Sequence, residues 1–133
     1  MIVRIAWSVV AIAAVAIVIG ASTDSVGSTD LGCSKTGSTG TDEYSCSAPI
    51  VDVVGVWPFV AMGAAMAGPP LLALVALRAW VSWVVVLVLI AVGAWGLAHW
   101  TSVWLTLVFA ILLALVGLVL AAVQSALSLR ASR

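Results

Sequence analysis

Charged residues are scarce in this sequence, and asparagine is absent. Only 8% of its 133 residues are Asp, Glu, Lys or Arg, whereas 65% are hydrophobic. That balance excludes a soluble globular protein, because a domain of this size cannot bury so much apolar surface. The five basic and five acidic residues cancel, so net charge does not indicate a nucleic-acid partner. The missing Asn, with abundant Ala, Val and Gly, favours a bacterial source with a GC-rich genome.

Four apolar stretches contain none of the charged residues, and they cover roughly residues 5–21, 53–77, 80–98 and 103–123. Each has close to the ~20 residues with which a helix crosses ~30 Å of hydrocarbon. We therefore predict an all-α membrane protein whose four transmembrane helices form an antiparallel bundle. Residues 1–133 are expected to form a single integral membrane domain, with the lipid bilayer around its apolar faces.

The basic residues predict the orientation, because cytoplasmic segments of membrane proteins are enriched in Lys and Arg. Lys35 alone lies on one side of the predicted membrane, and the other side holds Arg4, Arg78, Arg130 and Arg133. We expect both termini in the cytoplasm, a bacterial plasma membrane, and one long extracytoplasmic loop over residues 22–52. Indole rings prefer membrane interfaces, and six tryptophans lie near predicted helix ends: Trp7, Trp57, Trp80, Trp83, Trp100 and Trp104. The deeper Trp95 is a candidate for packing between helices.

The first stretch has an alternative interpretation as a secretory signal. Arg4 precedes the apolar run, and small residues that would permit cleavage follow it at Gly20, Ala21 and Ser22. The run of about sixteen residues exceeds the usual length of a signal, which favours a retained helix. Cleavage would leave three helices and an amino terminus outside the cell.

The predicted outer loop contains both cysteines, Cys33 and Cys46. Its Ser, Thr and Gly content predicts irregular structure, and an oxidising compartment favours a disulfide between the two cysteines. The bond would close a loop of about 14 residues and stabilise it by ~3 kcal/mol. A redox pair is disfavoured, because there is no C-x-x-C spacing and Lys35 is the one cation nearby.

No metal site or cofactor is predicted. The acidic residues of the loop do not follow the alternating pattern of a calcium-binding loop. His99 is the one histidine, at the outer end of the third stretch. A water-exposed imidazole is favoured there over a pH sensor, and no second metal ligand is visible.

Small residues predict where helices pack together. In the fourth stretch they recur at helical spacing on one face, at Ala110, Ala114, Gly117 and Ala121. Gly63 and Ala67 are assigned the same role in the second stretch. Similar faces are expected at Ala13, Ala16 and Gly20 in the first stretch and at Ala91, Ala94 and Ala98 in the third. On the far side of the fourth stretch, lipid contact is expected for Leu112, Val116, Val119 and Val123.

Gly68, Pro69 and Pro70 lie deep in the second stretch and predict a kink, because proline lacks the N–H donor and its ring clashes with the preceding turn. In transporters such breaks form binding sites together with polar or charged partners. Those partners are missing here, so a static kink is favoured.

The middle of each stretch contains no acid, base or histidine, which argues against an ion-coupled transporter. The four-helix length is similar to that of small multidrug transporters, but the membrane-embedded glutamate of that family is missing, so no family is assigned. No catalytic constellation is present. We expect a non-catalytic accessory or interaction subunit that assembles with other membrane proteins or with itself. The alternatives are a phage-type holin or superinfection-immunity protein, and a small transporter of neutral solutes.

Overall fold

The computed structural model describes residues 2–25, 27, 47–99 and 103–131, and every element named in them is helical. The elements are α1 (Ile2–Thr23), α4 (Ile50–Val54), α5 (Trp57–Ala76), α6 (Ala79–Ala98), the 3-10 helix η1 (Val103–Val108) and α7 (Phe109–Ala131). Ser25 and Pro49, at the two described ends of the segment that joins α1 to α4, form an isolated β-bridge. The Ile50 N–H also donates to the Asp24 carbonyl at 2.9 Å.

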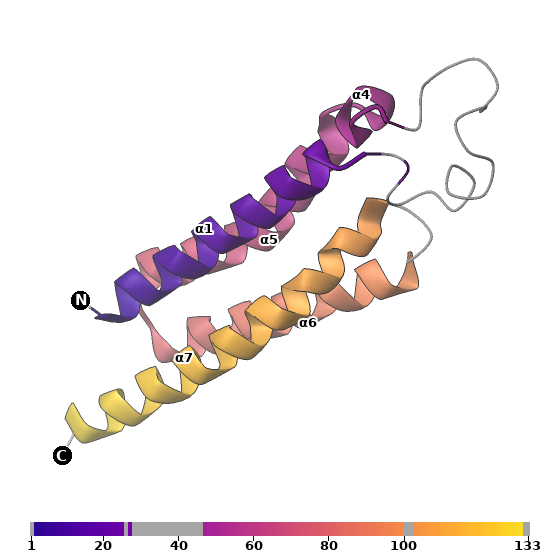
Figure 1. Ribbon diagram of the computed structural model, residues 1–133. Helices are drawn as coiled ribbons and strands as arrows, with labels where there is room; N and C mark the ends of the chain where they lie inside the picture. Colours follow the sequence, from indigo (N-terminus) through magenta and orange to yellow (C-terminus); the bar gives the residue numbers. More distant parts are fainter. Residues whose placement is uncertain (1, 26, 28–46, 100–102, 132–133) are drawn as a thin grey trace.

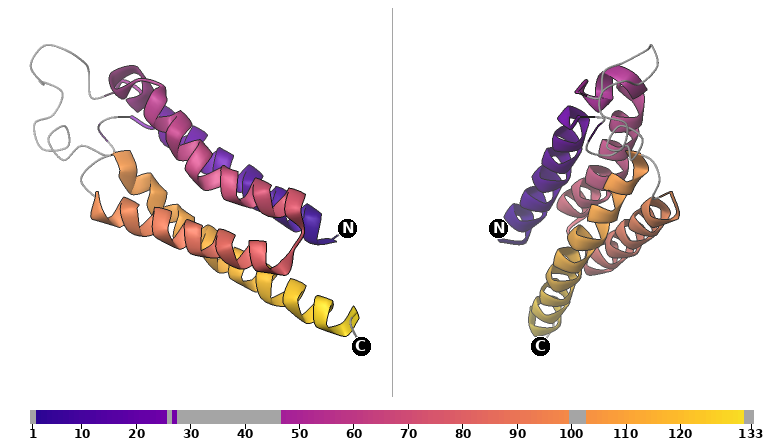
Figure 2. Two further views of the ribbon diagram at one scale, coloured as in Figure 1. Left: turned by 180° about the vertical axis from the view of Figure 1, so that it is seen from behind. Right: turned by 45° about the vertical axis from the view of Figure 1, so that its right-hand side comes forward.

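In the described part of the chain, four helices are long and apolar enough to cross a membrane, which indicates a multi-pass membrane protein. They cover Ile2–Thr23, Trp57–Ala76, Ala79–Ala98 and Trp104–Leu129. This confirms the predicted number of spans. Successive long helices run in opposite directions, and both chain ends lie at one end of the bundle (Figures 1 and 2).

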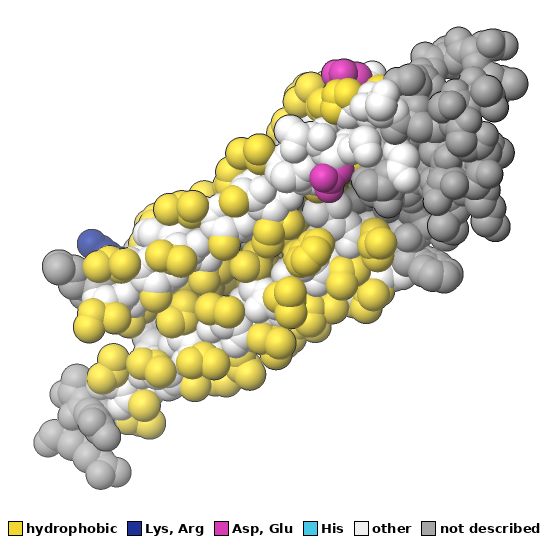
Figure 3. Space-filling model, viewed as in Figure 1, with side chains coloured by type: hydrophobic (Ala, Val, Ile, Leu, Met, Phe, Trp, Pro, Cys, Tyr) yellow, Lys and Arg dark blue, Asp and Glu magenta, His cyan; other side chains and the backbone are white. Residues whose placement is uncertain are grey.

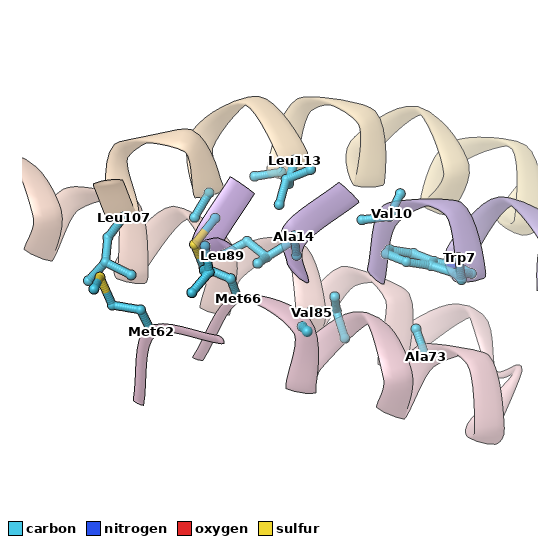
Figure 4. Packing of buried hydrophobic residues seen from close by; sticks show 14 of the residues in the cluster. Trp7, Val10, Ala14, Met62, Met66, Ala73, Val85, Leu89, Leu107 and Leu113 are labelled. Carbon is cyan, nitrogen blue, oxygen red and sulfur yellow. The ribbon is translucent and has the colours of Figure 1, made fainter. Parts of the chain in front are cut away.

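The helices close into a ring, in which α1 packs on α5, α5 on α6, α6 on α7, and α7 back on α1. The contacts between α1 and α5 and between α6 and α7 are the most extensive. Inside the ring, Trp7, Met62, Met66 and Leu89 are fully buried. Figure 4 shows side chains from all four long helices meeting in this apolar cluster.

The second long helix begins at Trp57, four residues after its predicted start at about residue 53. Residues 50–54 form the separate helix α4, which ends at Gly55 with a φ of 84°, a conformation that glycine adopts without strain. α5 then begins at Trp57, with Pro58 in its first turn, where the missing N–H has no helical partner to lose. The chain therefore turns between residues 54 and 57 before it enters the membrane-length helix.

The fourth helix also differs from its predicted range of 103–123. Its first two turns are the 3-10 helix η1, and α7 continues to Ala131. The extension contains Gln124, Ser125 and Ser128, polar residues that end the apolar run in the sequence but do not interrupt a helix. The first and third helices lie within three residues of their predicted bounds.

Glycines in α6 allow it to approach the last helix closely. A Cβ on Gly96 would lie 2.8 Å from the Leu107 Cβ and 2.9 Å from the Val108 backbone nitrogen. One on Gly93 would lie 3.2 Å from the Ile111 backbone nitrogen. Backbone atoms cannot yield as a flexible side chain can, so residue 96 requires glycine; a Cβ on residue 93 would collide mainly with the Ile111 side chain at Cγ1. This is the small-residue helix contact that is common in membranes.

Most of the outer surface of the bundle is apolar (Figure 3). Only 28 to 33% of each span is buried inside the protein, so lipid must cover much of the remainder. In Figure 3 the basic side chain in view lies at the end that holds the termini, and the acidic ones in view lie toward the loop end. The described charges are Arg4 and Arg78 at the first end and Asp24 and Asp52 at the second.

Candidate functional site

The small residues assigned to packing in the fourth helix all lie inside the bundle. Ala110, Ala114, Gly117 and Ala121 are buried. On the opposite side, the residues expected to face lipid are all exposed: Leu112, Val116, Val119 and Val123. Gly117 meets α1, because a Cβ there would lie 3.2 Å from Trp7 Cη2, and it meets α6 at 3.3 Å from Val86 Cγ2.

The two packing residues assigned to the second helix differ from each other. Ala67 is buried in the core. Gly63 is half-buried, and a Cβ on it would meet only the Val18 Cγ1, at the ordinary distance of 4.0 Å. Gly63 therefore does not bring backbones together. It lines a crevice of about 240 Å³ between α1 and α5.

The small faces predicted for the other two helices are largely wrong. Ala91, Ala94 and Ala98 are exposed, and α6 instead turns Gly93 and Gly96 toward α7 and η1. In α1 the buried alanines are Ala11 and Ala14, whereas Ala16 and Gly20 are exposed and Ala13 is half-buried. Both helices are rich in small residues, so more than one face of each has small residues at helical spacing.

A buried polar cluster, which was not predicted from the sequence, joins the α5–α6 turn to α7. Ser82 Oγ donates to Gln124 Oε1 at 2.8 Å, and Gln124 Nε2 donates to the Leu77 carbonyl at 2.9 Å. Ser82 is fully buried and Gln124 nearly so. Leu77 has a φ of 48°, and its carbonyl lies at the end of α5, where carbonyls have no helical partner. Gln124 satisfies that carbonyl.

A second polar contact lies beside this cluster. Trp83 Nε1 donates to Ser125 Oγ at 3.2 Å, and Ser125 Oγ donates to the Ala121 carbonyl at 2.8 Å. Gln124 is the one glutamine in the chain, placed just after a long apolar run, and that signal could have identified it. Its partners could not be identified, because they depend on the register between α6 and α7.

The described tryptophans differ in how deeply they are buried. Trp57, Trp80, Trp83 and Trp95 are exposed, so Trp95 does not pack between helices. Trp7 is fully buried, contrary to its expected interfacial position, because Gly117 leaves room for its ring. Trp7 Nε1 has no hydrogen-bond partner among the described residues. Trp104 is half-buried against the core, and Trp100 lies outside the described residues.

His99 is exposed at the end of α6, as expected. Its ring stacks on Trp95 with centroids 4.4 Å apart, and its Nδ1 lies 3.0 Å from the Trp95 carbonyl oxygen. Within the described residues, no three His, Cys, Asp or Glu side chains lie close enough to hold a metal ion.

Gly68, Pro69 and Pro70 lie inside α5, which remains helical from Trp57 to Ala76. Pro70 is buried, whereas Gly68 has no atom within 4 Å of the place where its Cβ would be. The triplet does not interrupt the helix, and the kink stays a prediction. Cys33 and Cys46 lie outside the described residues, so their disulfide also stays a prediction.

The chain matches no known family model, and comparison with curated proteins and with solved structures also finds no match. The described residues contain two notable features. One is an apolar interior in which Trp7 packs against Gly117, and the other is a polar cluster of Ser82 and Gln124 at one end of the bundle. Neither arrangement resembles a nucleophile with its base or an acid–base pair.

Proposed function

We propose that the protein is a small, non-catalytic accessory or interaction subunit of a larger bacterial membrane complex or of a homo-oligomer. It is a single integral membrane domain in the plasma membrane, with both termini in the cytoplasm. The observation that carries this proposal is the filling of the bundle interior. Large apolar side chains from all four long helices occupy it: Trp7, Met62, Met66, Leu89 and Leu113.

A transporter or channel needs polar groups along a path at membrane depth. The two buried polar side chains of the described residues, Ser82 and Gln124, bond to each other and to Leu77 at one end of the bundle. They therefore stabilise the fold and do not line a path. An activity of this protein then lies on its outer surfaces, where lipid and other membrane proteins make contact.

The proposed orientation follows the charges. Arg4 and Arg78 lie at the end that holds both termini, and Asp24 and Asp52 lie at the loop end. Basic residues favour the cytoplasmic side. The long polar segment then faces the outside, where Cys33 and Cys46 would form their disulfide.

Reconstitution in liposomes tests whether the protein alone has a transport function. We expect neither dye release nor ion flux from purified, reconstituted protein, because its interior is filled by apolar side chains. Robust flux that Pro69→Ala and Pro70→Ala abolish would overturn the proposal in favour of a transporter or pore. Val116→Ala, on the exposed face of α7, is the control for a nonspecific loss.

A further inference from the structure

We draw no further inference here: the strongest candidate, the outward small-residue face of α5 formed by Ala61, Ala64 and Gly68, carries none because nothing among the described residues shows what covers it.

Discussion

Trp7 of α1 occupies the space that the missing side chain of Gly117 leaves on α7: a Cβ on Gly117 would lie 3.2 Å from Trp7 Cη2 and 3.6 Å from its Cζ3. The contact joins the first and last helices of the chain and closes the bundle. It also explains why a tryptophan near a helix end is fully buried. The ring packs against Gly117 and has no hydrogen-bond partner for its Nε1 among the described residues.

Gly117→Leu should destabilise the bundle. A leucine would collide with the Trp7 ring and with Val86, and overpacking of this kind typically costs ~1–3 kcal/mol. Val116→Leu is the matched control, because Val116 is the adjacent residue and is exposed on the lipid side. Thermal unfolding in detergent measures both variants. Equal stabilities of the two would contradict the assignment of Gly117 to helix packing.

Ser82 and Gln124 should be energetically coupled. Gln124→Leu removes the acceptor of Ser82 and the donor to the Leu77 carbonyl, so the single variant should lose more stability than its change in size implies. Interhelical hydrogen bonds in a membrane protein contribute ~0.6 kcal/mol on average and at most ~1.7 kcal/mol. A double-mutant cycle of Ser82→Ala with Gln124→Leu should give a coupling energy in that range.

The control for this cycle pairs Ser128→Ala with Gln124→Leu. Ser128 lies on the same helix, but its exposed hydroxyl donates to the nearby Ser125 carbonyl, at 2.8 Å. Those two changes should be additive. If the Ser82 and Gln124 changes are equally additive, the hydrogen bond between them does not stabilise the fold.

The orientation can be tested with reporter fusions. Reporters joined after Arg133 or placed in the turn at Arg78 should read cytoplasmic, because basic residues favour that side. One placed within residues 34–45 should read extracytoplasmic. As a control, the same reporters would be read in a chain that lacks α1. Comparison with the full-length chain shows whether α1 is needed to set the orientation. A cytoplasmic reading from residues 34–45 would refute the proposed orientation.

The number and approximate positions of the four spans could be predicted from the sequence, because a helix in lipid needs a long run without charges. The start of α5 could not, since residues 53 and 54 are as apolar as those that follow. The turn there depends on the backbone conformation of Gly55, which hydropathy does not record. Likewise, the serines and Gln124 after residue 123 end the apolar run but not the helix.

Which face of each helix is buried was predicted less well than where each helix lies in the sequence. α7 has one small-residue face, so its buried side could be identified, but α6 offers both Ala91, Ala94, Ala98 and the glycines Gly93 and Gly96. Close backbone approach favours glycine over alanine, and a preference for glycine would have selected the correct face. The bond between Ser82 and Gln124 depends on how α6 and α7 align, which no local pattern contains.

The mass of the native assembly tests the proposed function most directly. The tagged chain would be expressed at its natural level, extracted from its own membrane in a mild detergent, and examined by native mass spectrometry. A subunit that acts through its surfaces should be released as a complex of fixed stoichiometry, with other membrane proteins or with further copies of itself. Because Gly117 is buried, Gly117→Leu should weaken that complex only to the extent that it unfolds the chain. If the chain is instead found only as a monomer with bound lipid, in every detergent that preserves its helices, the account is contradicted.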